Sequence, residues 1–125
     1  MEQGADVSKS TLLEEKSFLF ATRVIKLSKY LTVNHREYVL SKQILRSGTS
    51  IGALIRESKY AQSKADFLHK QMIALKEANE TDYWLELLKS SEYISVKMYH
   101  SLKPDIIELL KLLIASTKTI KNKIK

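Results

Sequence analysis

Three histidines and two closely spaced glutamates are the side chains best suited to metal or acid–base chemistry. A di-metal site in a helical bundle needs Glu-x-x-His on two helices, and only Asp66-x-x-His69 comes near that pattern. Glu77 and Glu80 share a helix face, but acids at this spacing usually pair with basic side chains. No signature of a Ser/His/Asp enzyme is present. The sequence therefore predicts no catalytic residue, no metal and no cofactor.

The segment Arg46-Ser47-Gly48-Thr49-Ser50-Ile51-Gly52-Ala53 has two interpretations. As a loop before a helix it would cradle phosphate, but it lacks the Gly-Lys-Ser/Thr tripeptide and the preceding strand of a P-loop. As part of a helix it places Gly48 and Gly52 on one face, where a neighbouring helix can approach closely. We favour the helical interpretation and expect the glycines to pack against Ala74 and Ala78.

Basic residues mark two candidate phosphate-binding surfaces. Lys42, Arg46 and Arg56 recur at helical spacing on one face, with Lys59 nearby. The net charge is +7, and the four lysines of residues 118–125, which include Lys118 and Lys121, leave only +3 for the rest. Solvated helix faces, and lysines at the negative end of a helix dipole, explain both patterns without a ligand.

Three consecutive large residues, Tyr83, Trp84 and Leu85, give a hint of a partner. Helix neighbours are 100° apart, so the three cannot all point into one core. Because Tyr and Trp are enriched at protein interfaces, we predict that Tyr83 and Trp84 form an oligomer interface.

Composition and periodicity predict the elements that position these residues. A chain of 125 residues with three Gly and one Pro is long enough for one domain and favours long helices over sheets. No apolar run is long enough to span a bilayer, and no secretion signal is visible, so we expect a cytoplasmic protein. We divide the chain into a flexible N-terminus (1–11), a bundle (12–121) and a basic tail (122–125).

Four helices are expected in the bundle, each with an apolar stripe. The first runs from Leu12 to Leu31, with Phe18 and Ile25 widening its buried face, and Asn34 caps the second. Ser63 caps the third. The fourth either begins at Pro104 or, as we favour, begins near Ser95 and is kinked at Pro104. Short connections then predict an all-α, up-down-up-down antiparallel four-helix bundle.

Two separated motifs resemble a bacterial four-helix-bundle family encoded in intervening sequences of 23S rRNA genes. They are Gln43-Ile44-Leu45-Arg46-Ser47-Gly48-Thr49-Ser50-Ile51-Gly52-Ala53 with Ile55 and Glu57, and Ser63-x-x-Asp66-Phe67 with Ala74-Leu75-Lys76-Glu77-Ala78-x-Glu80-Thr81-x-Tyr83-Trp84-Leu85. The chain is also similar to the accessory protein of diversity-generating retroelements. Leu54 departs from the pattern, because relatives commonly have Asn there.

This resemblance implies a barrel-shaped homopentamer that binds RNA or DNA through basic surface and has no established enzymatic activity. We therefore expect a non-enzymatic, nucleic-acid-binding homo-oligomer without membrane contact. Its expected phosphate contacts are Lys42, Arg46, Arg56, Lys59, Lys118 and Lys121. The alternative is a protein-interaction scaffold whose basic charge is only solubilising.

Overall fold

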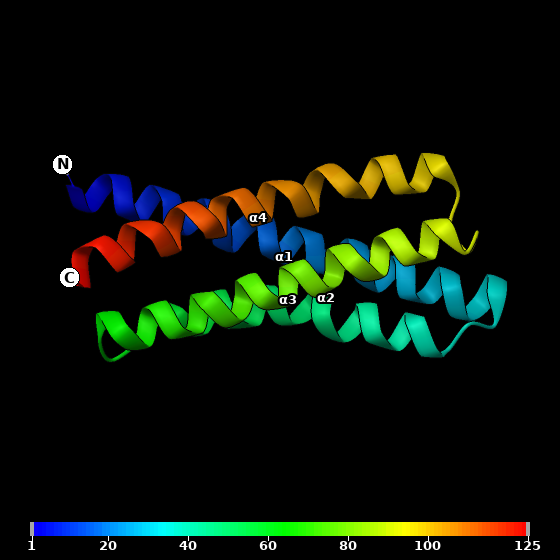
Figure 1. The fold of residues 1–125 in the computed structure, drawn as a ribbon, viewed down its shortest axis with the longest axis horizontal. Helices are drawn as coiled ribbons and strands as arrows, with labels where there is room; N and C mark the ends of the chain where they lie inside the picture. The colour runs from blue at the N-terminus through cyan, green and yellow to red at the C-terminus, as the bar shows by residue number, and fades with distance from the viewer. Residues whose placement is uncertain (1, 125) are drawn as a thin grey trace.

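The structure, a computed structural model, describes residues 2–124 of the chain, and the side chains of 11–124. It contains four helices, α1 (Glu2–His35), α2 (Val39–Ser58), α3 (Lys64–Ser90) and α4 (Val96–Ile124). Each helix runs antiparallel to the one before it, as Figure 1 shows. Within residues 2–124 there is no strand, and no Cα atom of α1 lies within 8 Å of one in α3, nor one of α2 within 8 Å of one in α4. The predicted up-down-up-down bundle is confirmed, with the helices at the corners of a square.

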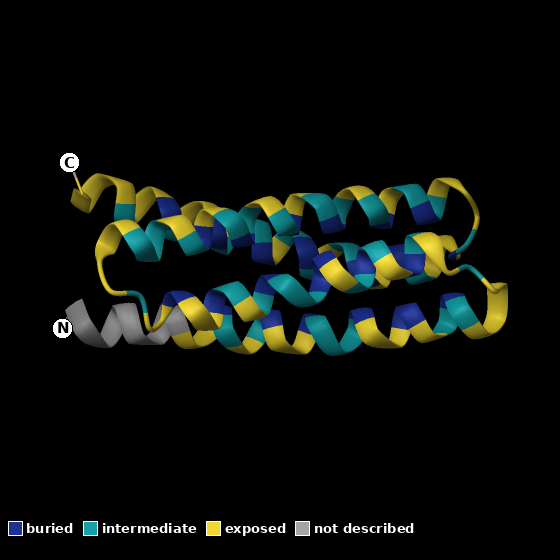
Figure 2. Cartoon of the chain, turned by 90° about the horizontal axis from the view of Figure 1, so that it is seen from below, coloured by how far each residue is buried: buried dark blue, intermediate teal, exposed yellow. Residues whose placement is uncertain are grey.

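The core lies along the bundle axis and is built from the predicted stripes. Phe20, Val24 and Leu27 of α1 are buried, and so are Ile106 and Leu113 of α4. The buried side of each helix faces the axis in Figure 2. One expectation for α1 is wrong, because Phe18 and Ile25 do not widen the buried face and are instead exposed.

Side-chain caps fix the starts of three helices. Ser63 accepts a hydrogen bond from the Asp66 backbone N–H at 3.1 Å, which confirms the predicted cap of α3. Ser95 accepts from the Met98 N–H at 3.1 Å at the start of α4. The predicted Asn34 cap of α2 is wrong: Asn34 still belongs to α1. The carboxylate of Glu37 accepts the N–H groups of residues 39, 40 and 41 instead, at 3.2, 3.1 and 2.8 Å.

The first and last helices are longer than predicted. The first helix begins at Glu2 rather than Leu12, and the last continues to Ile124. The flexibility assigned to residues 1–11 stays a prediction. Pro104 lies inside α4, which begins at Val96. The favoured prediction of a helix start near Ser95 is therefore confirmed, and the kink at Pro104 stays a prediction.

The α1–α2 turn and the α3–α4 turn each contain a non-glycine residue in the left-handed conformation. Arg36 follows α1 with φ 52°, and Glu92 follows α3 with φ 62°. Close behind them, the Glu37 N–H bonds to the Leu31 carbonyl at 3.0 Å and the Tyr93 N–H to the Leu88 carbonyl at 3.0 Å. The bond at the end of α3 is that of a Schellman motif, and the bond at the end of α1 spans one residue more. Glycine is usually the left-handed residue at such helix ends.

The two glycines lie inside α2 and face α1, not α3. A Cβ atom at Gly48 would lie 2.8 Å from both methyl carbons of Val24, and one at Gly52 would lie 3.4 Å from the backbone oxygen and the hydroxyl of Ser17. The expected packing of these glycines against Ala74 and Ala78 is therefore wrong. The helical interpretation of the segment is confirmed, because residues 46–53 all belong to α2.

Candidate functional site

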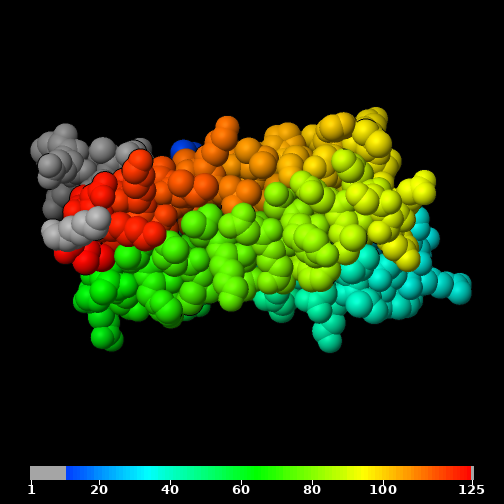
Figure 3. Space-filling model, in the orientation of Figure 1, coloured from blue at the N-terminus to red at the C-terminus, as the bar shows by residue number. Residues whose placement is uncertain are grey.

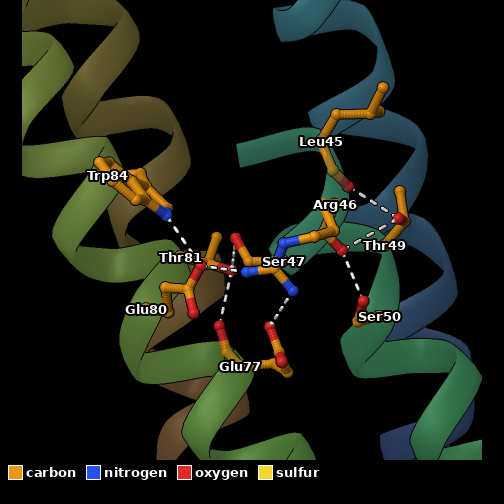
Figure 4. A network of polar contacts seen from close by, with 9 residues as sticks. All are labelled: Leu45, Arg46, Ser47, Thr49, Ser50, Glu77, Glu80, Thr81 and Trp84. Atoms are coloured by element: carbon orange, nitrogen blue, oxygen red, sulfur yellow. Dashed lines mark hydrogen bonds and ion pairs between the residues drawn. The ribbon is translucent and has the colours of Figure 1, made fainter. Parts of the chain in front are cut away.

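A cluster of polar side chains joins α2 to α3 around Arg46 (Figure 4). One guanidinium nitrogen of Arg46 donates to Glu77 Oε1 at 3.1 Å, and the other donates to Glu80 Oε2. The Arg46 side chain is 48% exposed, whereas those of Glu77 and Glu80 are 15% and 30% exposed. The guanidinium thus closes over two largely covered carboxylates at the surface of the seam.

Beneath this clamp, the next residue of each helix forms a second contact. The hydroxyls of Ser47 and Thr81 lie 2.8 Å apart, and Thr81 Oγ1 also lies 2.8 Å from the Glu77 carbonyl oxygen. Both residues are fully buried. Buried hydroxyls are costly unless hydrogen-bonded, so this pair fixes how α2 and α3 meet.

Trp84 completes the cluster. Its indole N–H donates to Glu80 Oε2 at 3.1 Å. This hydrogen bond lowers the pKa of Glu80 below its ordinary value. Arg46 lowers it further, and burial opposes both effects without cancelling them. Hydrogen bonds and charge from the two glutamates raise the pKa of Arg46. A carboxylate held ionised by two fixed donors is a poor general acid. We interpret Glu77 and Glu80 as acceptors that lock two helices together.

The predicted interface residues have unequal surroundings. Tyr83 is 59% exposed and Leu85 is buried, while Trp84 is half-buried against the core. The rings of Tyr83 and Trp84 meet edge to face with centroids 5.1 Å apart. The argument that three consecutive large residues cannot all enter one core is confirmed. Whether Tyr83 and Trp84 contact another subunit stays a prediction, and Trp84 already has an intramolecular role.

Further ion pairs link the remaining helices, so that every seam of the square is crossed. Arg23 reaches Asp105 at 2.6 Å and also donates to the Ser101 carbonyl at 2.9 Å, joining α1 to α4. Lys103 joins α4 to α3. The other cross-helix pairs are Lys16–Glu108, Lys59–Glu14 and Lys70–Glu57.

Lys103 shows how strongly such a pair is held. Its ammonium group is hydrogen-bonded to Asp82, and to Glu86 at 2.8 Å. Burial alone would lower the pKa of Lys103, but these hydrogen bonds outweigh it and raise the pKa above its ordinary value.

The structure divides the predicted phosphate-binding residues into two groups. Arg46 is committed to its glutamates, and Lys59 lies 3.8 Å from Glu14. The others, which are Lys42, Arg56, Lys118 and Lys121, are exposed and make no salt bridge among the described side chains.

These four residues do not form one patch. Lys42 and Arg56 are about 21 Å apart along α2, at 1.5 Å per residue. Arg56 lies at the same end as the last turns of α4, because a hydrogen-bonded chain of Ser58, Gln71 and Ser116 crosses α2, α3 and α4 at that level. In Figure 3 the end of α4 lies beside the first turns of α3 at this end.

Two further properties bear on the class of protein. Among the side chains described, no group of three or more His, Cys, Asp or Glu residues is arranged to hold a metal ion. Over the same residues, no helix has an apolar stretch long enough for a membrane span. The expectation that Glu77 and Glu80 pair with basic side chains is confirmed. Spacing did not identify Arg46, on the neighbouring helix, as the partner of both.

The fold and this cluster define an all-helical bundle whose distinctive residues fasten α2 to α3. These residues fall in the region that matches the model of the 23S rRNA-intervening sequence protein family over residues 10–115, and the chain belongs to that family. The chain is similar to a crystal structure of a protein of unknown function from the S23 ribosomal protein family of Bacteroides thetaiotaomicron VPI-5482. That similarity has 55% identity and a TM-score of 0.86, over 88% of this chain and 98% of the other. No curated protein matches the chain.

Proposed function

We propose that this chain is a non-enzymatic, homo-oligomeric bundle protein that binds RNA or DNA through its basic surface. The observation that carries the proposal is how the charges are used. Most acidic side chains in residues 11–124 are taken up by cross-helix ion pairs, and two more, Glu37 and Asp66, accept backbone N–H groups at helix starts. The charges left without partners are therefore mainly basic, which favours a polyanionic ligand.

The ion pairs narrow the set of residues proposed to contact phosphate. Arg46 would have to leave two glutamates to bind a phosphate group, so we assign it to the fold. Arg56, Lys118 and Lys121 have no such commitment and share one end of the bundle. We take this basic end, defined as these three residues, as the main contact surface. Lys42 is a separate contact at the other end, and Lys59 is a weaker one.

The pentamer implied by the family resemblance would multiply this contact. Several copies of a basic end in one particle bind one long polyanion far more tightly than one copy does. The second candidate function, a protein-interaction scaffold, is favoured by exposed apolar side chains, and it predicts no salt-dependent affinity for RNA or DNA.

Fluorescence anisotropy with a labelled single-stranded RNA and a DNA duplex, over a series of salt concentrations, tests the proposal. The double variant Lys118→Ala/Lys121→Ala should lower the affinity and flatten the salt dependence, with a slope change of roughly 0.7 per lost phosphate contact on single strands. The matched control Lys76→Ala/Lys97→Ala removes the same charge from exposed positions elsewhere and should change both much less. Equal effects of the two variants would reject the basic end. No salt-dependent binding by the wild type would reject nucleic-acid binding and favour the scaffold.

A further inference from the structure

The outward face of α1 carries several large apolar side chains among a few charged ones. Within the described side chains, the large exposed hydrophobic residues of α1 are Leu12, Phe18, Leu19, Ile25 and Val33. At 100° per residue they fall within an arc of about 140° on the side of the helix opposite the buried stripe. Figure 2 shows this exposed outer edge of α1 running along the molecule, with buried positions on its inner edge. We call these five residues the α1 stripe.

Five large exposed apolar side chains on the outer face are unusual for a helix at the surface of a bundle. Such a helix normally places charged or polar residues away from the core, and a helix that is apolar on opposite sides is normally buried on both. The hydroxyls on this face do not change its character. Thr22 Oγ1 donates to the Leu19 carbonyl at 2.6 Å, and Thr32 Oγ1 to the Lys29 carbonyl at 3.1 Å. Glu15, Lys26 and Lys29 also project from this arc, so the stripe is suited to a contact that buries apolar side chains beside charged ones.

The size of the stripe matches half of an interface. Its side chains are between 40% and 78% exposed. If each offers about 200 Å² when fully exposed, the stripe leaves roughly 500 Å² of apolar surface in water. That is near the upper end of about 300–600 Å² for the largest patch on a monomer. A standard interface buries about 800 Å² on each partner, so the stripe with its rim supplies most of one.

The charges around the stripe favour a second copy of this chain as the occupant. Glu15 is exposed near its first residues, and Lys26 and Lys29 are exposed in its second half. A polyanion or an anionic membrane would match only the lysine end. The facing surface of another copy of this chain can carry both signs, so acid and base can be matched while the apolar side chains of the stripe are buried. In a ring of copies that facing surface is a different part of the next copy, because a stripe that binds an identical stripe closes as a dimer.

We infer that the α1 stripe is the surface through which one copy of the chain binds the next. This inference rests on the homo-oligomer of the proposed function and replaces Tyr83 and Trp84 as the centre of its interface. Tyr83 is a single exposed ring on α3, and Trp84 is held by Glu80 within its own subunit. The stripe, in contrast, extends over about 32 Å of helix at 1.5 Å per residue.

Leu19→Glu tests the inference, with Tyr83→Glu as its matched control. The two residues are 62% and 59% exposed, so neither change touches the core of the bundle. Each lowers the net charge by one from +7, so added repulsion between copies cannot cause dissociation. The readout is solution mass by light scattering, with helix content from circular dichroism. Leu19→Ser, which adds no charge, covers the case in which the glutamate variant does not fold.

We expect a wild-type mass that is a multiple of 14.4 kDa. Leu19→Glu should weaken assembly on the order of 100-fold, since it places a charge in an apolar contact. Leu19→Ser should weaken it less, and Tyr83→Glu should leave it unchanged. Leu19 variants that keep the wild-type mass, or dissociation by Tyr83→Glu alone, would overturn the inference while leaving the homo-oligomer intact. A wild-type mass of one chain would overturn both the inference and the homo-oligomer. A wild type that assembles but does not bind nucleic acid would count against the proposed function alone.

Discussion

Replacing Gly48 by alanine should destabilise the bundle although it replaces a poor helix former with the best one. The new Cβ atom would lie 2.8 Å from each methyl carbon of Val24, whereas carbon atoms pack at about 3.5–4.0 Å. Val24 is 1% exposed and β-branched, so it has little freedom to move away. Overpacking of this kind costs about 1–3 kcal/mol, and alanine returns about 1 kcal/mol of helix propensity. The difference between the two leaves a fall in the free energy of unfolding of up to about 2 kcal/mol.

Gly52, one turn further along α2, supplies a control with the opposite sign. The nearest atoms to a Cβ there are the backbone oxygen and the hydroxyl of Ser17, both at 3.4 Å. That distance is close to an ordinary contact, so the gain in propensity remains. Gly52→Ala should leave stability unchanged or raise it by up to about 1 kcal/mol.

Urea unfolding followed by circular dichroism measures both variants. Protein concentration is held fixed, because the stability of an assembling protein depends on it. A shift of the midpoint at constant slope reports stability. In the double variant with Val24→Ala, Gly48→Ala should cost less than it does alone, because the methyl groups it meets are gone. The reasoning is refuted if Gly48→Ala is as stable as the wild type, or if the two glycine substitutions shift stability in the same direction.

Two further predictions follow from the turns and the clamp. Arg36→Gly should raise the free energy of unfolding by about 1 kcal/mol, because a left-handed residue with a Cβ costs 1–2 kcal/mol; a midpoint at or below that of the wild type would contradict this. The lowered pKa of Glu80 contributes stability that is present above its ordinary value of 4.5 and is lost as pH falls through the folded-state pKa. The stability difference between the wild type and Glu80→Gln should therefore be largest near neutral pH and shrink below about pH 4.5, and a difference independent of pH would argue against the ionised clamp.

Periodicity predicted which residues of a helix face the core, but not which neighbouring helix each flank would meet. Ile106 and Leu113 were correctly placed inside, and Ser63 was correctly placed at a helix start, because both depend on local spacing. Gly48 was assigned to the wrong neighbour. Residue spacing does not determine which neighbouring helix lies on which flank of α2, so either flank is compatible with α1 and with α3.

The candidate site was predicted less well for a related reason. Arg46 has helical spacing with Lys42 and Arg56, and a count of positive charges treats the three alike. Only the fold shows that Arg46 reaches two carboxylates on α3 while the other two reach none. Phe18 was placed inside because it is apolar. Its exposure is informative only once the core is known, since an apolar residue outside the core suggests a second contact.

The ion pairs at the seams also select the handedness of the bundle. The same apolar stripes would fill the core of a bundle in which the helices followed one another in the opposite sense around the axis. On α4, however, Lys103 lies on the flank beside Asp82 of α3, and Asp105 lies on the flank beside Arg23 of α1. In the mirror arrangement every helix exchanges its two neighbours, so the flank of α2 that carries Arg46 would face the flank of α1 that carries Arg23. The flank of α4 that carries Asp105 would face the flank of α3 that carries Glu77 and Glu80. Like charges would then meet along the α1–α2 and α3–α4 seams, so this pattern of surface charge disfavours the topology that the hydrophobic pattern leaves open.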